Sequence, residues 1–279
     1  MALLRKPVGP TSHDLVDRAR RALGIRRVGH LGTLDPFAGG LLVVVVGRAT
    51  RLASCAARWT KTYEAVARLG VRTTTDDATG AVTATSEAWR GLGPEAIATA
   101  LAGFRGPQRQ APPVFSAVRV DGERAYRRAR RGEAVVVAAR SVEVLELDVV
   151  DVRVPEVAFR ASVAAGTYLR ALARDLGQVL GCGAHLAALT RTRVGPFRLA
   201  DAIEVEALTP DRLLAPAALV ADLPRRDLDA AERAAVLHGR PVMSEGLAER
   251  VGLFAAGELV AVAEREGGLL KPRVVVGVA

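Results

Sequence analysis

With 279 residues, half of them hydrophobic, the chain is long enough for one large domain and a small one without disulfide staples. Its 39 Lys and Arg outnumber 30 Asp and Glu, and the formal charge of +9 favours a polyanionic partner, with a merely basic protein as the alternative. Cys55 and Cys182 form no C-x-x-C pair and the longest apolar run, Leu41–Val46, is too short to span a bilayer, so we expect a cytoplasmic protein with neither disulfides nor a membrane span.

The first 50 residues predict a short strand, a helix, a glycine-rich loop and a buried strand. Thr11 and Asp14 form a capping box ahead of apolar residues at helical spacing. The loop Gly29–Gly40 then leads into Leu41–Val46, whose continuous and mostly β-branched character is typical of a strand covered on both faces. A loop that leads into a central strand can hold a side chain rigidly.

The middle of the chain predicts a series of strands with helices between them. Apolar and polar residues alternate over 62–69, which indicates a strand with one face in the core, and the polar run Thr73–Gly80 predicts a loop. Pro94–Phe104 has helical periodicity, which the prolines of Gly106–Pro113 interrupt. We expect further strands over Val114–Val120, Glu133–Val154 and Val157–Ala164. Asp121-Gly122 predicts a turn after the first of them, followed by a short basic helix. A second helix is expected over Tyr168–Leu180.

A domain boundary is predicted where three prolines and a cluster of charges lie in Pro210–Asp229. This divides the chain into a large domain, 1–225, and a small β-rich one, 226–279. In the small domain we expect a helix over Ala230–Leu237 and strands at Leu253–Val262 and Pro272–Val278. The order mixes strands and helices without a strict βαβ rhythm, which favours an α+β fold with a mixed sheet.

The densest concentration of functional residue types is the loop around Asp35. Its glycines allow the backbone to approach a ligand closely, and Pro36 stiffens the turn just after the acid. Taken alone, an Asp before a Pro is more often a turn residue that accepts backbone hydrogen bonds, and a lone His30 is more often structural than catalytic. No Gly-Lys-Ser/Thr follows the glycines, which excludes a P-loop.

This loop resembles the second motif of the TruB family of tRNA pseudouridine synthases, in which the aspartate is catalytic. Four other segments are similar to family motifs and follow in the family's order: Arg5–Asp14, Lys61–Ala65, Gln110–Gly132 and Gly166–Leu186. The resemblance covers roughly residues 3 to 200, and the C-terminal end resembles, more loosely, an RNA-binding module of the PUA type. Two positions depart from the pattern, Arg5 where the family usually has Asp and Gly39 where it usually has Thr or Ser.

The resemblance implies the pseudouridine synthase catalytic fold, α+β with a mixed, largely antiparallel central sheet flanked by helices, plus a small β-rich PUA-like C-terminal module. It also implies that uridine 55 in the T-arm loop of tRNA is isomerised to pseudouridine, with no obligate protein partner. Nothing is oxidised, reduced or hydrolysed, so neither a cofactor nor a metal is expected. Asp35 would act on C1′ of the sugar or on C6 of a flipped-out uracil, and the sequence leaves both routes open.

The resemblance assigns roles to other residues as well. Burial alone would raise the pKa of Asp35 and neutralise it, and a pairing with Arg170 is expected to reverse that effect. Tyr63 would stack on the uracil, and His30 would help to hold the opened RNA loop. The substrate-binding set is completed by Lys6, Lys61, Tyr168, Gly32 and Thr33. The arginines of 20–27 and 119–131 would bind phosphates, although a solvated helix face is the alternative for any one of them.

Two other functions compete with tRNA modification. One is that of the guide-RNA-dependent relative that modifies ribosomal RNA within a multiprotein particle, which usually carries a longer C-terminal domain and basic tails. The other is an RNA-folding chaperone that binds tRNA without chemistry, for which Asp35 would be dispensable. The presence of Asp35, Tyr63 and Arg170 argues against a protein that only binds RNA.

Overall fold

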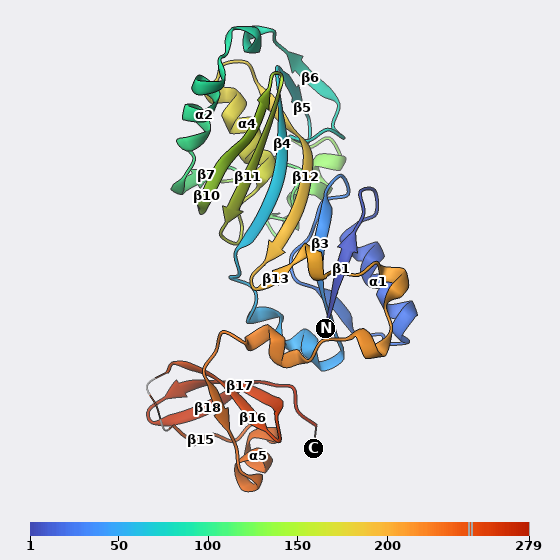
Figure 1. The fold of residues 1–279 in the computed structure, drawn as a ribbon, viewed down its shortest axis with the longest axis vertical. Coiled ribbons are helices and arrows are strands. Elements are labelled where there is room, and N and C mark those ends of the chain that lie inside the picture. Colours follow the sequence, from blue (N-terminus) through green and yellow to red (C-terminus); the bar gives the residue numbers. More distant parts are fainter. Residues whose placement is uncertain (245, 247, 279) are drawn as a thin grey trace.

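The computed structural model describes residues 1–244, 246 and 248–278, which form two large β-sheets and two small two-stranded ones (Figure 1). Among these residues the first sheet has nine strands and the second has five. In the first sheet β3 and β12 are parallel and the other pairs are antiparallel, which confirms the predicted α+β class. In spatial order this sheet comprises β1 (Ala2–Lys6), β3 (Gly39–Val46), β12 (Ala184–Val194), β4 (Lys61–Leu69), β11 (Glu156–Val163), β10 (Arg140–Arg153) and β7 (Gly106–Gln110), with β2 (Val28–His30) on β3 and β13 (Phe197–Arg198) on β12.

Helix α1 (Ser12–Leu23) begins where the capping box predicts. The backbone N–H of Thr11 donates to the Asp14 carboxylate at 2.7 Å, and the Asp14 N–H donates to the Thr11 hydroxyl at 3.1 Å. The helix ends at Gly24, whose left-handed φ of 66° is easy for a residue without a Cβ. Both ends of the helix are therefore determined locally.

Strand β3 is buried at all eight positions, as its apolar run predicts. Because side chains alternate across a strand, Leu42, Val44 and Val46 pack under α1, while Leu41, Val43 and Val45 lie in a different cluster on the opposite face. That second cluster includes residues of the other sheet. Strand β3 therefore lies between α1 on one face and, on the other, the cluster that includes residues of the second sheet.

Strand β12 is the central element that the sequence pattern did not predict. It pairs in parallel with β3 through Thr190 and Gly39 and antiparallel with β4 along most of its length. Two register shifts, after Leu186 and after Arg191, interrupt its alternation. The strand connects the N-terminal β1–β3 pair to the β4–β11–β10 group (Figure 1).

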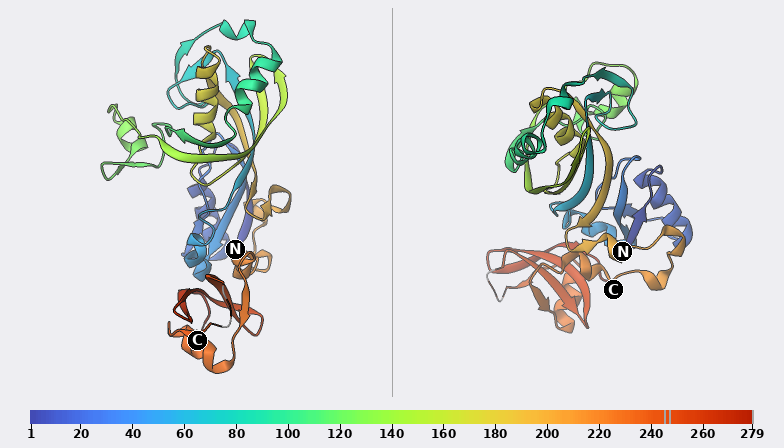
Figure 2. Two further views of the ribbon diagram at one scale, coloured as in Figure 1. Left: turned by 90° about the vertical axis from the view of Figure 1, so that its left-hand side faces the viewer. Right: turned by 45° about the horizontal axis from the view of Figure 1, so that its top comes forward.

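Two helices cover one face of the β4–β11–β10 group (Figure 2). Helix α4 (Leu169–Val179) and α2 (Pro94–Ala102) pack their apolar residues against the alternating core face of β4. Tyr63, Ala65 and Ala67 of β4 belong to this cluster, which confirms the predicted one-sided strand. The expected helices at 94–104 and 168–180 are therefore both present.

Several predictions between residues 106 and 139 were wrong. Gly106–Pro113 was expected only to interrupt structure, yet β7 pairs there with β10, and its Pro107 is tolerated because β7 is an edge strand. Only Arg119–Val120 of the expected strand 114–120 is extended and paired, and 133–139 precede β10 without joining the sheet. The remaining elements of this half are β5 (Val71–Thr73), β6 (Val82–Thr85), β8 (Arg119–Val120), β9 (Glu123–Arg124) and α3 (Ala125–Arg130). The β8–β9–α3 segment projects from the body of the molecule (Figure 2, left).

The second sheet begins at Arg225. Its strands in order are β14 (Arg225–Asp227), β16 (Arg250–Ala255), β17 (Glu258–Glu266), β18 (Leu269–Val275) and β15 (Val242–Met243), with α5 (Ala230–Leu237) beside them. The expected helix is present, but the single strand predicted over 253–262 is the β16–β17 hairpin. Its turn is at Ala256-Gly257, where both residues have positive φ. A continuous apolar pattern concealed this turn because the flanking strands are both buried.

The two sheets share a hydrophobic core. Phe254, Leu259 and Val276 of the C-terminal part pack with Ala49 and Leu52, which lie on a short 3₁₀ helix after β3. The 3₁₀ helices are η1 (Gly47–Ser54), η2 (Ala88–Gly91), η3 (Leu199–Asp201), η4 (Val205–Ala207), η5 (Pro210–Arg212) and η6 (Pro216–Val220). Apolar packing of this kind fixes the C-terminal module against the first domain.

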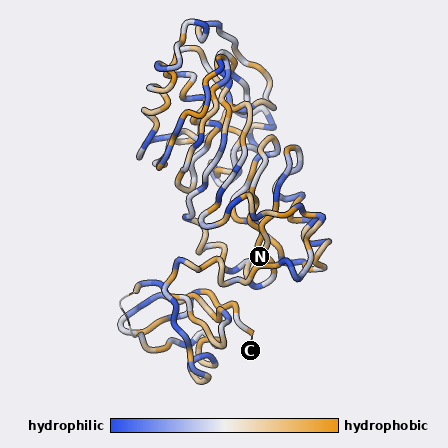
Figure 3. The backbone as a smooth tube through the Cα atoms, in the orientation of Figure 1, coloured by the Kyte–Doolittle hydropathy of each residue, from blue (hydrophilic) through white to orange (hydrophobic). Residues whose placement is uncertain are grey.

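Hydrophobic and hydrophilic stretches interleave along both parts of the chain (Figure 3). Over the described residues, no helix has the length and apolar character needed to cross a membrane.

Candidate active site

The loop between β2 and β3 is held by hydrogen bonds from several directions. The Ser12 hydroxyl is buried and bonds both the carbonyl and the N–H of Leu34, at 3.0 and 2.8 Å. The N–H of Gly9 donates to the carbonyl of Pro36 at 2.8 Å, and the N–H of Ala38 donates to the carbonyl of Asp35 at 3.1 Å. Asp35 therefore lies on a turn whose neighbours are fixed on both sides.

Two buried cations hold the backbone carbonyls of this loop. Lys6, 1% exposed, donates to the carbonyls of Ala38 at 2.7 Å, of Pro7 at 3.0 Å and of Pro36 at 3.4 Å. Arg191, also 1% exposed, comes from β12 and donates to carbonyls on the other side of the loop. Its acceptors are the carbonyls of Leu41 at 2.8 Å, Gly32 at 3.0 Å and Thr33 at 3.4 Å.

Lys6 was expected to bind substrate, but its ammonium is occupied by the protein's own carbonyls. Burial lowers its pKa to about 8, with Asp35 opposing and Arg191 reinforcing the shift. Arg191 was missed at the sequence level because an arginine in a Thr-Arg-Thr-Arg run looks like a surface residue. Only the position of β12 shows that it is a positioning residue for the Asp35 loop.

Asp35 and Arg170 form the predicted ion pair. The Nε of Arg170 lies 2.9 Å from Oδ2 of Asp35, and its Nη2 donates to Oδ1 at 3.3 Å. The Arg170 side chain is 4% exposed, whereas a third of the Asp35 side chain, 33%, remains accessible. The guanidinium thus lies buried beneath the site, and the carboxylate is the group of the pair that solvent or a ligand can reach.

Arg170 is itself fixed by three further contacts. It donates to the carbonyls of Thr75 and Phe115, both at 2.9 Å, and its Nη1 lies 3.5 Å from the carboxylate of Asp77. Asp77 is buried, and its other oxygen accepts hydrogen bonds from the Thr75 and Thr79 hydroxyls at 2.7 and 2.6 Å. The polar run around residue 77 was predicted only as a loop, so this second acid was missed.

Asp77 reaches the site because its loop docks on β12. The N–H of Ala78 donates to the carbonyl of Leu186 at 3.1 Å, and the N–H of Leu186 donates to the carbonyl of Asp76 at 3.0 Å. The site therefore contains two carboxylates on either side of one guanidinium, in the order Asp35, Arg170, Asp77. These three groups, two carboxylates and one guanidinium, together carry one net negative charge.

Burial raises the pKa of Asp35 above its ordinary value. Asp77 adds to this shift, whereas Arg170 and, more weakly, Lys6 oppose it. The expectation that Arg170 would reverse the effect of burial was therefore wrong: the guanidinium offsets only part of it. Asp77 shares the same cation, which limits that compensation.

The two tyrosines occupy different surroundings. Tyr63 is buried on β4, in the cluster that contains Leu34 and Ala38 of the Asp35 loop. Tyr168 precedes α4, and the guanidinium carbon of Arg140 lies 5.1 Å from the centre of its ring. The backbone of Tyr168 is held at both its N–H and its carbonyl by a buried amide, that of Gln110, at 2.8 and 3.2 Å.

His30, Lys61, Gly32 and Thr33 lie around the start of the same loop. Burial, together with Arg191, lowers the pKa of His30, and its buried Nδ1 has no hydrogen-bond partner among the described residues. The ammonium of Lys61 donates to the Trp59 carbonyl at 2.6 Å, and burial lowers its pKa as well. The carbonyls of Gly32 and Thr33 are both acceptors of Arg191, so the backbone at these two positions is part of the support of the loop.

Ser116 is a further candidate that the sequence did not distinguish. Its hydroxyl is buried and has no partner among the described residues. It follows Phe115, whose carbonyl accepts from Arg170. A buried, unpaired hydroxyl beside the ion pair can supply a hydrogen bond to a bound ligand.

The two departures from the family pattern have clear surroundings. Arg5 lies 3.2 Å from Glu204 in an exposed ion pair, remote in sequence from the loop. Gly39 begins β3, and a Cβ there would lie 3.4 Å from the Lys6 carbonyl, an ordinary contact. The loop remains anchored by Lys6 through its neighbour Ala38.

Among the described residues, no group of three or more His, Cys, Asp or Glu side chains is arranged to hold a metal ion. The candidate site is instead an accessible carboxylate above a buried guanidinium, on a loop held by two buried cations.

Comparison with known proteins identifies the family of the chain. Residues 20–169 match the model of the TruB family pseudouridylate synthase N-terminal domain, and 170–231 match the tRNA pseudouridylate synthase B C-terminal domain. A protein from Thermobifida fusca (strain YX) named tRNA pseudouridine synthase B is 46% identical over 286 residues, covering 99% of this chain and 97% of that protein. One of the same name from Ralstonia nicotianae is 43% identical over 289 residues, covering 97% and 91%.

Solved structures share the fold. A structure of an H/ACA ribonucleoprotein bound to a substrate RNA containing 2′-deoxyuridine aligns with a TM-score of 0.74 at 24% identity, covering 99% of this chain and 84% of that one. A Cbf5–Nop10–Gar1 complex aligns with a TM-score of 0.75 at 26% identity and the same coverage. With family models matching most of its length and full-length relatives above 40% identity, the chain belongs to the TruB family of pseudouridylate synthases.

Proposed function

We propose that this protein isomerises uridine 55 in the T-arm loop of tRNA to pseudouridine, in the cytoplasm, with Asp35 as the catalytic carboxylate. The observation that carries the proposal is the Asp35–Arg170 pair: an accessible carboxylate beside a nearly inaccessible guanidinium. The relatives named tRNA pseudouridine synthase B support the choice of tRNA as substrate.

The reaction breaks the bond between N1 of uracil and C1′ of the ribose and forms a bond between C5 and the same C1′. The proton on C5 is lost, and N1 gains one, so the atoms of substrate and product balance without an external reactant. Asp35 acts at C1′ or at C6, as a covalent nucleophile or as the counter-charge of a positive centre at the sugar. Both routes require the carboxylate to be ionised.

Within the chain of three charges, Arg170 is the group that favours this condition. Arg170 stabilises the ionised form of Asp35, while burial and Asp77 disfavour it. A carboxylate whose negative charge is incompletely compensated is a better nucleophile, and a better partner for developing positive charge, than one fully neutralised by its guanidinium. Asp77 also orients Arg170, through the 3.5 Å contact with Nη1.

The target base must leave its stack to reach Asp35, because a base within a folded loop is inaccessible to a carboxylate. In the proposal Tyr63 forms one wall for the uracil, packed against the Asp35 loop, and His30 with its unpaired Nδ1 contacts the opened RNA. Tyr168 is a second candidate contact beside the cationic Arg140. Lys61, Gly32 and Thr33 support the loop and its mouth.

The projecting segment β8–β9–α3 is the proposed clamp on the RNA backbone. Two of its arginines, Arg128 and Arg131, are paired with Asp121, Glu123 and Glu133 of the same segment at 2.7–2.8 Å and hold it together. The exposed Arg124, Arg127 and Arg130 are the better candidates for phosphate contacts. The C-terminal module, residues 226–279, is proposed as a PUA-like RNA-binding domain.

The test is release of tritium from tRNA that carries 5-tritiated uridine. We expect release by the wild type and none by Asp35→Asn, with tRNA binding retained by both. Equal release by the variant would reject the mechanism. Absence of release from both, with binding intact, would favour an RNA chaperone that performs no chemistry, and release only in the presence of a guide RNA would favour the guide-dependent relative.

A further inference from the structure

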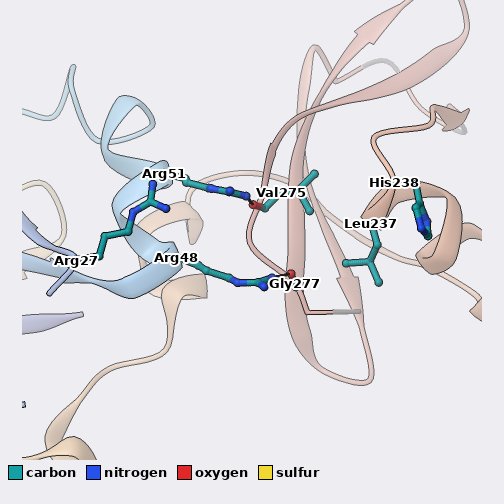
Figure 4. A pocket seen from close by; sticks show the side chains of 7 residues that line it. All are labelled: Arg27, Arg48, Arg51, Leu237, His238, Val275 and Gly277. Carbon is teal, nitrogen blue, oxygen red and sulfur yellow. Dashed lines mark hydrogen bonds between the residues drawn. The ribbon is translucent and has the colours of Figure 1, made fainter. Parts of the chain in front are cut away.

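A second cluster of positive charge lies between the two sheets, away from Asp35. A cavity of about 320 Å³ opens there, where the 3₁₀ helix η1 faces the last strand and α5 of the C-terminal module (Figure 4). Both parts of the molecule contribute to its walls, which are formed by Arg27, Arg48, Arg51, Leu237, His238, Val275 and Gly277.

Each of the three arginines is held by a hydrogen bond of its own. Arg48 and Arg51 are three residues apart on η1, and side chains at this spacing lie directly above one another in a 3₁₀ helix. Arg51 donates to the carbonyl of Val275 at 2.9 Å and Arg48 to that of Gly277, so both extend toward the C-terminal module (Figure 4). Arg27 is oriented from the side, because its Nε donates to the Thr50 hydroxyl at 2.7 Å.

The charge of this cluster is not neutralised. All three arginines are exposed, and none has a carboxylate partner within the part of the chain that the structure describes, unlike Arg225 and Arg273. Two of them bond carbonyls of the other domain, which accounts for one of the five N–H donors of each. Arg27 makes no bond across the interface, and its two Nη groups have no partner among the described residues. Contacts between the domains therefore do not account for the position of the Arg27 guanidinium.

Three guanidiniums that line one cavity and retain free donors match the chemistry of a phosphate. A planar guanidinium can donate two hydrogen bonds to the oxygens of one phosphate, and the residues that line the cavity include no carboxylate that would repel an anion. We propose that this cavity binds a backbone phosphate of the tRNA outside the T-arm that carries the target uridine. This proposal rests on the proposed function.

The length of β3 separates the two sites. The strand runs from Gly39, next to the Asp35 loop, to Val46, next to η1. At about 3.3 Å per residue, eight residues place the cavity roughly 25 Å from the Asp35 loop. A ligand that reaches both positions must be a large folded polyanion. The shared hydrophobic core keeps the two walls of the cavity in place before the RNA binds, so little ordering is needed on binding.

The experiment compares Arg27→Ala with Arg212→Ala, which removes the same charge from an exposed arginine outside both the cavity and the segments expected to bind phosphates. Equilibrium binding is measured at several salt concentrations with full-length tRNA and with an isolated T-arm hairpin. For full-length tRNA, Arg27→Ala is expected to weaken binding by about three- to tenfold and to reduce the salt slope by roughly 0.7 to 0.9, the value for one lost phosphate contact. Its affinity for the hairpin is expected to equal that of Arg212→Ala.

Equal effects of the two variants on full-length tRNA would overturn the proposal, as would an equal loss on tRNA and hairpin. A thermal shift produced by inorganic phosphate in the wild type but not in Arg27→Ala, without any change in RNA affinity, would assign the cavity to a free anion and also reject it. Arg27→Gln, which keeps a donor for Thr50, repeats the test should the alanine variant lose stability. Binding is measured without turnover, so a failure of the catalytic proposal would leave this result readable.

Discussion

The replacement of Arg170 by Met tests how the site is held together. Met retains most of the apolar stem but removes the charge from two carboxylates and two backbone carbonyls. Removal of one partner from a buried ion pair costs about 3 to 5 kcal/mol, because the remaining charge stays buried without compensation. At roughly 2 to 4 °C per kcal/mol for a chain of this size, Arg170→Met should lower Tm by roughly 6 to 20 °C.

The control is Arg160→Met, which breaks a surface ion pair with Glu64 between side chains that are more than half exposed. Such pairs contribute about 1 kcal/mol or less, so its Tm should fall by less than about 4 °C. Addition of Asp35→Asn to Arg170→Met removes one of the stranded carboxylates. This addition should restore part of the loss, and a double-mutant cycle over the pair should give a coupling of about 0.5 to 3 kcal/mol.

The same variant makes a second prediction, for pH dependence. With Arg170 absent, burial and Asp77 continue to raise the pKa of Asp35 while its main opposing cation is lost. The acidic limb of the rate profile for tritium release should therefore move to higher pH. A Tm close to that of the wild type, together with an unmoved acidic limb, would refute the view that Arg170 compensates the buried charge.

Three further predictions concern the Asp35 loop. Because the pKa of Asp35 is raised in the fold, its contribution to stability is complete below the unfolded-state pKa and is lost as the pH rises through the folded-state pKa. Asp35→Asn, which is always neutral, should therefore melt at or above the wild-type Tm at pH 7 and lose this advantage in acid. A lower Tm of the variant at pH 7 would show that the guanidinium outweighs burial. Arg191→Met leaves the backbone carbonyls of Gly32, Thr33 and Leu41 without their donor. It should lower the free energy of unfolding by about 3 to 5 kcal/mol in urea titrations, with Arg191→Lys intermediate. A loss as small as about 1 kcal/mol would contradict the positioning role of Arg191. Gly40→Ala places a Cβ against the carbonyl of Arg191, closer than van der Waals contact allows, and should abolish stable folding, whereas Gly47→Ala, with open space around it, should cost only about 1 to 2 kcal/mol. Similar yields and melting curves for the two variants would refute the close approach of β3 to β12.

The sequence determined the elements whose cause is local. The capping box at Thr11 starts α1, the unbroken apolar run makes β3 a strand buried on both faces, and alternation over 62–69 gives β4 its single core face. The loop of Asp35 and its pairing with Arg170 followed from the resemblance to a known family, because each motif is a short contiguous segment. In these cases neighbouring residues carry the whole signal.

Strand β12 shows where local reasoning failed. Its residues, Ala184–Val194, include His and Arg at positions that become buried, and two register shifts break the period of two on which strand prediction depends. Pairing with β3 and β4 stabilises the strand, although its sequence pattern does not indicate one. Once β12 is in place, Arg191 changes from an apparent surface residue to a buried support of the loop.

Charge balance was likewise decided by the tertiary structure. The sequence places Asp77 in a polar loop, but docking of that loop on β12 brings its carboxylate to the far side of Arg170 and alters the pKa of Asp35. The three arginines of the cavity between the sheets are likewise unremarkable until packing of the C-terminal module closes the other wall. The sequence, through the family resemblance, indicated the Asp35–Arg170 pair and the local elements that hold it. Only the folded chain fixed how their charges combine, because electrostatic interactions depend on distance and burial between residues that are remote along the chain.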